Sequence, residues 1–423
     1  MVKATITIPL AHRAFFLLIL LLFFLATITE VAALDTQTTG ASIEAVLPQG
    51  ACESGSSPAP AVTAKVDPRM ELLSIALSMT TWFELRGLPE DVNYPYAEDI
   101  GGWFGNYSDH VLIKQLQRCT DMGFAYDAPV NFICHFGPPQ ALVQRYNYSW
   151  SIIRGVDETE LNKLAEVFRA FAVETNFMTF YAAHQSFYEE IETTINTEQN
   201  WTEVRVLLER FFGESRASYS VILAPFLFPG GGYGGWVATT TETHALCVIR
   251  TPSIQNERPA FGSPATIKHL ALHEFAHSFI NPVVDQHLWA IQDYVELFTP
   301  VADNMSQMGY GLWQVMLYEI LVRAFTAWAY GEEYGHDSVD DKLDHEEELG
   351  FYFIRDIYKA YRDFMANRDS YPTWGGFFPE ILRVLEKVAT SDSSSAQPSM
   401  GFPFLECLLV MGINAFVFRK KSA

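Results

Sequence analysis

SPATIKHLALHEFAHSFINP, residues 263–282, contains two histidines four residues apart, with a glutamate directly after the first. The stretch opens with Ser-Pro, in which the serine can cap a helix and the proline suits its first turn. It closes with Asn-Pro, a common helix stop. These signals predict a helix over about residues 264–280. Because four residues make about one helical turn, we expect His273 and His277 on the same face.

The pattern H-E-x-x-H indicates a zinc site, because both imidazoles can reach one ion while the glutamate approaches a water on that ion. Apolar residues flank the motif on most sides of the helix, so its ionisable groups are expected to be buried and to need partners. We therefore predict one Zn²⁺ bound by His273 and His277, with Glu274 as the catalytic base. Over the two turns from His269 to His277 the helix rises about 12 Å, too far for one ion, so we expect His269 to be exposed or beside the site.

A catalytic zinc site has three protein ligands and one open position. The longer pattern HExxHxxGxxH is absent, since Ile280 stands at its glycine position and Val283 at its last histidine. The candidates for the third ligand are Asp285, His287, Glu296 and Glu319. The first two follow the Asn-Pro turn, where a capping role and a surface position are more typical. The third has a spacing found in some thermolysin-like enzymes, but its polar neighbours resemble a solvated face.

Glu319 is the candidate that we favour. It lies in GLWQVMLYEILVRAFTAWAYG, residues 311–331, which is apolar nearly all round and predicts a buried helix. Glu319 and Arg323 are the only charged residues of this segment, and they lie four apart on one face. A buried carboxylate beside an arginine forms either an internal salt bridge or a metal ligand held by that arginine. With HExxH elsewhere in the chain, the ligand interpretation is favoured.

HEFAHSFINPVVD (273–285) followed by YEILVRAFTAW (318–328) resembles an uncharacterised family of zinc-metallopeptidase type, described mainly as a domain of unknown function. Other stretches between about residues 70 and 330 resemble it too, among them ELLSIALSM, GFAYDAPVNF and ETNFMTFYAAHQSFY. The family is similar to gluzincins, which combine HExxH with a distant glutamate. The resemblance implies a zincin-like fold and the same four site residues, and it says little about the substrate.

The expected fold class is α+β, mainly helical, with one zincin-like catalytic domain over residues 67–388. Helical periodicity predicts helices over 71–87, 109–123 and 201–213, and one long helix or two consecutive ones over 158–195. The β-type runs 219–228 and 244–252 predict part of a small antiparallel sheet beside the HExxH helix. GGGYGGW, residues 230–236, lies between them and predicts a flexible loop near the cleft or a plain hairpin connection.

Both ends of the chain carry targeting features. A basic start, an apolar run and small residues predict a signal peptide over residues 1–33, with an uncleaved anchor as the alternative. The remaining end segments are a linker (34–66), a Ser-rich spacer (389–400), a membrane anchor or sorting segment (401–418) and a basic tail (419–423). An amphipathic packing helix is the alternative for 401–418. These features predict a secreted or cell-surface protein, anchored in the membrane, with its catalytic domain outside.

The formal net charge of −22 argues against nucleic acid as a partner, because phosphates would be repelled. We predict an extracytoplasmic zinc metallopeptidase that hydrolyses a peptide or protein substrate. The run 244–252 could pair with an extended substrate as an added strand. The residues that could stabilise an oxyanion, or only pack, are Tyr233, Tyr310 and Tyr318. The alternative function is a surface-anchored binding protein on a peptidase scaffold, without catalysis.

The cysteines show no close spacing of the kind that binds metal. Cys119 and Cys134 could form a disulfide in an oxidising compartment, and the sequence leaves this open.

Overall fold

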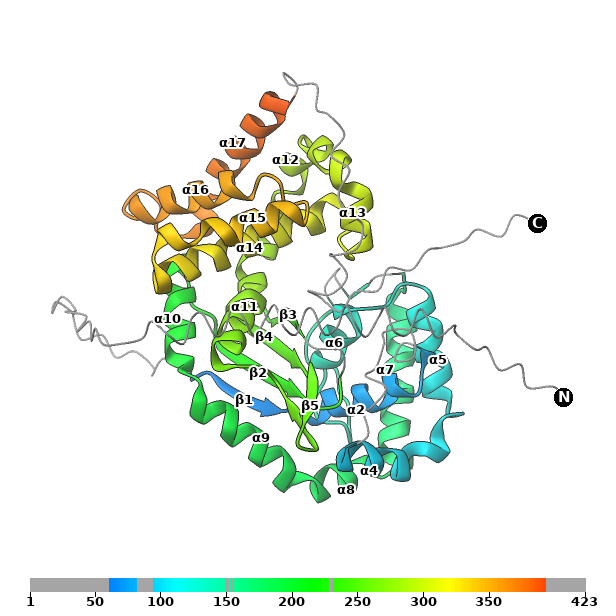
Figure 1. Cartoon of the computed structure of the whole chain (residues 1–423). Coiled ribbons are helices and arrows are strands. Elements are labelled where there is room, and N and C mark those ends of the chain that lie inside the picture. Colours follow the sequence, from blue (N-terminus) through cyan, green and yellow to red (C-terminus); the bar gives the residue numbers. More distant parts are fainter. Residues whose placement is uncertain (1–60, 82–93, 149–151, 154, 228–230, 393–423) are drawn as a thin grey trace, which may run out of the picture. The chain divides into compact units, whose positions relative to one another are not determined.

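A four-stranded sheet carries the helix that contains HExxH (Figure 1). The computed structural model describes residues 61–81, 94–148, 152–153, 155–227 and 231–392. The expected α+β, mainly helical fold class is observed in these residues. The predicted signal peptide, membrane anchor and basic tail lie outside them, as do most of the linker and of the spacer. None of the described helices has both the length and the apolar character needed to cross a membrane.

The strand order of the sheet is β1-β2-β4-β3. Its strands are β1 (Thr63–Val66), β2 (Ser218–Ala224), β3 (Gly231–Ala238) and β4 (Thr243–Arg250). β1 and β4 both run parallel to β2, whereas β3 is antiparallel to β4. The prediction that the two β-type runs form an antiparallel pair is therefore wrong. They are parallel neighbours because β3 brings the chain back before β4 begins.

Two segments predicted to lack regular structure are strands of this sheet. The glycine-rich stretch predicted as a loop forms β3, which pairs with β4 over its whole length. Residues 63–66, assigned above to the linker, form β1 and pair with residues 220–223 of β2. Both segments are short or rich in residues that disfavour strands, so local propensity does not reveal them. Their pairing with β2 and β4 decides their conformation.

Side chains from the neighbouring helices cover the outer edge of β1. The amide group of Asn196 bonds both the N–H and the carbonyl of Ala64. The carboxylate of Glu192 accepts from the N–H of Val66, and the hydroxyl of Tyr181 donates to the Val66 carbonyl. These contacts satisfy the backbone groups that an edge strand would otherwise expose.

The helices of the first half of the chain are α2 (Pro68–Ser78), α4 (Pro95–Phe104), α5 (Val111–Asp121), α6 (Asp127–Cys134), α7 (Glu158–Glu174), α8 (Phe177–Ala183), α9 (Gln185–Glu198) and α10 (Trp201–Phe212), with the short turn η1 (Gly105–Tyr107). Of these, α2 packs on β2, α6 on β3 and α9 on β1, whereas α10 packs on the HExxH helix. Segment 158–195 thus holds three helices, not one or two. One break is at Asn176, whose φ of 51° is left-handed, a conformation that asparagine tolerates.

The HExxH helix, α11 (Pro264–Gln286), is longer than predicted because it continues through Pro282. A proline inside a helix leaves the carbonyl four residues earlier without its N–H partner, here Ser278. Arg216 supplies the missing donor: its Nη2 lies 2.9 Å from the Ser278 carbonyl oxygen. The same guanidinium lies 3.6 Å from the ring centre of Phe279. A side chain distant in sequence therefore removes the helix stop that Asn-Pro predicted.

The second half of the chain forms a helical layer around α14 (Trp313–Tyr334), the predicted buried helix, which packs against α11 and α16 (Figure 1). The other elements of this half are β5 (Ser253–Gln255), β6 (Arg258–Ala260), α12 (Leu288–Gln292), η2 (Val295–Val301), α13 (Ala302–Gln307), η3 (His336–Ser338), α15 (Asp340–Glu348), α16 (Ile354–Ala366) and α17 (Trp374–Asp392). The last helix extends four residues past the predicted end of the domain at 388.

In the described part of the chain, three cysteines are buried free thiols: Cys119, Cys134 and Cys247. The first two, for which the sequence leaves a disulfide open, are unpaired. Burial raises the pKa of Cys134 to about 12, which keeps its thiol protonated and unreactive at neutral pH.

Glu71 of α2 is fully buried beneath the sheet. The hydroxyl of Tyr96 donates to its Oε2 at 2.5 Å, and that hydroxyl lies 2.7 Å from the hydroxyl of Tyr188. Burial raises the pKa of Glu71 to about 8, against the opposing effect of the Tyr96 hydrogen bond. The folded protein therefore holds this carboxyl group in its protonated form at neutral pH.

Replacing Glu71 with Gln should remove a pH dependence of stability. The pKa of Glu71 is raised in the folded state. Its contribution to the free energy of unfolding is therefore fully present below about pH 4.5 and is lost as the pH rises to about 8. The Glu71→Gln variant should therefore be more stable than the wild type at pH 9, by roughly 5 kcal/mol at most. Urea unfolding between pH 5 and pH 9 measures this, with the exposed Glu98→Gln as control; parallel curves for both variants and wild type would contradict it.

Candidate metal centre

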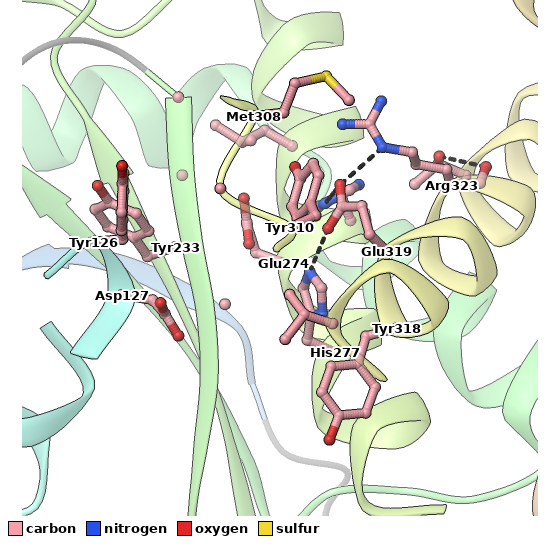
Figure 2. A pocket seen from close by; sticks show the side chains of 18 of the residues that line it. Tyr126, Asp127, Tyr233, Glu274, His277, Met308, Tyr310, Tyr318, Glu319 and Arg323 are labelled. Atoms are coloured by element: carbon pink, nitrogen blue, oxygen red, sulfur yellow. Dashed lines mark hydrogen bonds and ion pairs between the residues drawn. The ribbon is translucent and has the colours of Figure 1, made fainter. Parts of the chain in front are cut away.

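Two imidazoles and a carboxylate converge between α11 and α14. The Nε2 atom of His273 lies 3.4 Å from Oε1 of Glu319, and the Nε2 atom of His277 lies 3.7 Å from Oε2. Figure 2 shows Glu319 between His277 and Arg323, with a dashed interaction to each. The predicted spacing of four residues does bring the two histidines to one face, with ring centres 5.2 Å apart. The helix at 311–331 supplies the glutamate, as predicted.

The separation between Glu319 and each imidazole is of the size that a tetrahedral zinc ion requires, with a different carboxylate oxygen facing each ring. Donor atoms at about 2.0–2.2 Å from such an ion lie roughly 3.4 Å from each other. The nitrogen–oxygen separations in the cluster are 3.4 Å and 3.7 Å. Two imidazole nitrogens and one carboxylate are also a donor set that zinc accepts, leaving its fourth position open. His273, His277 and Glu319 could therefore hold the ion.

Hydrogen bonding prepares His277 for this role. Its Nδ1 lies 3.2 Å from Oδ1 of Asn281, an acceptor, which assigns the ring proton to Nδ1 and leaves the lone pair on Nε2. Burial lowers the pKa of His277 to about 4, so the ring is neutral at pH 7. A neutral imidazole with a free Nε2 is the form that binds metal.

Arg323 holds the carboxylate of Glu319. Its Nε donates to Glu319 Oε1 at 2.8 Å, and its Nη1 donates to Glu346 of α15 at 2.6 Å. Burial acts to raise the pKa of Glu319, but the charges of Arg323 and His273 outweigh it and hold that pKa well below its usual range. Tyr310 shares hydrogen bonds with both Glu319 and Arg323. Arg323 thus has the predicted position, and its second partner, Glu346, lies on a helix that no sequence motif connects to the site.

Glu274 lies beside the two histidines. One of its carboxylate oxygens and a ring nitrogen of each histidine all lie within 4.8 Å of one another. The side chain is buried against β3, and burial raises the pKa of Glu274 to about 7. A carboxyl group that titrates near neutral pH can both accept and return a proton. Of the two carboxylates at the site, Glu319 contacts both imidazoles more closely and is the better ligand.

The glycines of β3 let this strand lie directly against the HExxH helix. A methyl group on Gly232 would lie 2.5 Å from Oε1 of Glu274. One on Gly234 would lie 2.5 Å from the Glu274 carbonyl oxygen and 2.9 Å from Cδ2 of His277. Alternate residues of a strand face the same side, so both positions must lack a side chain. The glycine content of GGGYGGW therefore reflects close packing of a strand, not a flexible loop.

The other ligand candidates lie away from the two imidazoles. Glu296 is exposed in η2, where its carboxylate accepts from the hydroxyl of Thr299. Asp285 instead accepts hydrogen bonds from Gln314 and Tyr318 of α14. The Nδ1 atom of His287 lies 2.8 Å from the Val283 carbonyl oxygen. His269 is half-buried one turn before His273, with its ring 5.7 Å from that of Tyr330.

The cluster opens into a cavity of about 480 Å³. The cavity extends to both faces of β3: Glu274 and His277 line it on one side, Tyr126 and Tyr233 on the other (Figure 2). All three tyrosines proposed for oxyanion stabilisation line this cavity. Tyr126 itself has the unusual backbone angles φ 60° and ψ −117°, a strained conformation of the kind that gathers at functional sites.

A family model described as Domain of unknown function (DUF4932) matches residues 62–384. The chain belongs to this family. The match includes β1, so the DUF4932 domain begins within the predicted linker, and it includes all four residues of the candidate metal centre. No curated protein and no solved structure matches the chain.

Replacing Gly234 with Ala should disturb the centre, because the new methyl group meets the Glu274 backbone and the His277 ring. We expect a loss of stability of about 1–3 kcal/mol and weaker zinc binding, since α11 must shift away from β3. Urea unfolding and zinc titration measure both effects. Gly101→Ala is the matched control, because a methyl group there meets nothing within 4 Å. Equal stability and zinc affinity of the two variants would show that β3 does not constrain the helix.

Proposed function

We propose that this protein is a zinc-dependent metallopeptidase, with His273, His277 and Glu319 as ligands and Glu274 as general base. The observation that carries the proposal is the placement of the Glu319 carboxylate against both Nε2 atoms, with a second carboxylate beside them. If Glu319 only formed a salt bridge with Arg323, it would not also need two imidazoles facing its carboxylate. The arginine and Glu346 instead act as the outer partners that orient a ligand carboxylate.

A bound zinc ion would supply an acidified water and polarise the scissile carbonyl. Glu274, placed next to the imidazole pair, would accept a proton from the attacking water and return it to the leaving amine. Tyr310 is the donor that we favour for the oxyanion, because its hydroxyl already bonds the Glu319–Arg323 pair. Burial raises the pKa of Tyr310 well above its usual range, so the hydroxyl stays protonated and can donate.

Among the described residues, β3 pairs with a strand on one side alone, so its other edge offers a place for an extended peptide. The run 244–252, predicted to accept a substrate strand, forms β4 and is paired on both sides, so it has no free edge. β3 is the edge strand on the side of the cavity, whereas side chains cover the opposite edge at β1. A peptide that adds to β3 would pass the metal centre, which favours a peptide or protein as the substrate.

The extracytoplasmic location and the membrane anchor are further proposals, which rest on the apolar segments 14–28 and 401–418. A secreted or cell-surface peptidase would act on peptides or proteins outside the cell.

Replacing Glu274 with Gln should reduce peptide hydrolysis by about 100- to 10,000-fold while one zinc ion per chain remains bound. The amide cannot accept the proton of the water, but the ligands are intact. A peptide-library digest analysed by mass spectrometry measures hydrolysis, and elemental analysis measures zinc. A variant as active as the wild type would exclude Glu274 as the base, and zinc-loaded wild type without hydrolysis would favour a binding protein.

Replacing Glu319 with Gln should weaken zinc binding by more than roughly 100-fold, because a charged ligand is replaced by a neutral amide. The matched control is Glu296→Gln, which removes the rival candidate in an exposed position. Competition with a zinc chelator measures both affinities. If Glu296→Gln weakens binding and Glu319→Gln does not, the assignment of the third ligand is wrong.

A further inference from the structure

Arg250, the last residue of β4, is a buried arginine without an acidic partner. Two arginines are buried among the described residues, Arg250 and Arg323. Arg323 pairs with two carboxylates. Arg250 forms no ion pair or side-chain hydrogen bond with any described residue, and its Nε is buried with no hydrogen-bond partner at all. Its side chain is 3% exposed and lines the same cavity as the metal centre.

The surroundings of Arg250 position its guanidinium group. The group lies over the ring of Tyr233, with Cζ 4.3 Å from the ring centre. Gly231, opposite Arg250 in the register, has a φ of 104°, and a methyl group there would lie 2.8 Å from Nη2. A ring therefore supports one face of the guanidinium, and a glycine makes room for its end. The charge of Arg250 also reaches Glu274, whose pKa it lowers against the larger effect of burial.

A buried guanidinium that forms no ion pair is unfavourable unless a ligand supplies a negative charge and hydrogen-bond acceptors. Its planar set of N–H donors matches the two oxygens of a carboxylate, and stacking on an aromatic ring leaves that donor edge accessible. Asp127 lines the same cavity as Arg250. The group that completes Arg250 would therefore come from outside the described residues.

We infer that Arg250 binds a carboxylate of the substrate, either the free C-terminus of a peptide or an acidic side chain. This inference rests on the proposed peptidase function and narrows its substrate class. Successive residues of a peptide paired with β3 would face alternately the metal centre and the side on which Tyr233 and Arg250 lie. A carboxylate next to the scissile bond in sequence could thus reach the guanidinium while the bond itself lies at the histidines.

The first test is equilibrium binding to metal-free protein, which excludes a direct carboxylate–zinc bond. The probes are acetyl-Ala-Phe as free acid and as amide, and the acetylated amides of Ala-Glu and Ala-Gln, measured by calorimetry on the full chain. The wild type should bind the acid of one pair more tightly than its neutral partner, by roughly tenfold or more. The pair that shows the preference identifies the source of the carboxylate.

Arg250→Gln should abolish this preference, Arg250→Lys should keep part of it, and the exposed Arg383→Gln should leave it intact. Equal binding of acids and neutral partners by the wild type, or a preference that survives in Arg250→Gln, would overturn the inference. These results do not depend on catalysis, so they stand even if no peptide is hydrolysed. With active enzyme, the same substitution should raise KM for the preferred acid substrate to that for its neutral partner.

Thermal unfolding tests whether Arg250 has only a structural role. Removing a buried charge that lacks a partner should leave Tm unchanged or raise it, whereas Arg323→Gln should lower Tm because the buried carboxylates of Glu319 and Glu346 both lose their arginine. A fall in Tm for Arg250→Gln as large as that for Arg323→Gln would assign Arg250 to the fold and remove the basis for the inference.

Discussion

Burial of the Glu319 carboxylate is the constraint on which the site depends. A carboxylate inside a protein needs compensating charge, and Arg323 with the two imidazoles of α11 surrounds this one. The contacts join α14 to α11 and, through Glu346, to α15. The same three elements line one side of the cavity. The helical layer is therefore attached to the sheet-bearing helix through the groups that could hold the metal, so metal binding and packing of the layers should be coupled.

A second constraint comes from β3, which limits α11 from the other side. β3 lies so close to α11 that neither Gly232 nor Gly234 can carry a methyl group. With α14 on its opposite side, α11 has little freedom to rotate, and rotation is what would move His273 and His277 away from Glu319. The rigidity that a preorganised site needs thus arises from backbone contact at β3 and from charge at α14.

The parts of the site that sequence predicts are those encoded locally. The spacing of His273 and His277 and the polar pair in the apolar helix follow from helical geometry, so their faces can be read directly. β1, β3 and the extension of α11 past Pro282 depend on partners far along the chain: β2, β4 and Arg216. Glycine at alternate positions, 232 and 234, is the one local signal that could have marked β3 as a strand packed against another backbone.

The two edges of the sheet differ in a way that bears on function. At β1, Asn196 and Glu192 occupy the backbone groups of Ala64 and Val66, so no peptide can add there without displacing them. At β3 the cavity lies along the edge instead, with Asn131 bonding one carbonyl, that of Gly234. The half-buried edge of β3 therefore lies beside two histidines and two carboxylates, whereas side chains protect the opposite edge. An edge strand that is not covered by side chains is a liability for aggregation, and binding of an extended chain next to the candidate metal centre is the function that would account for it.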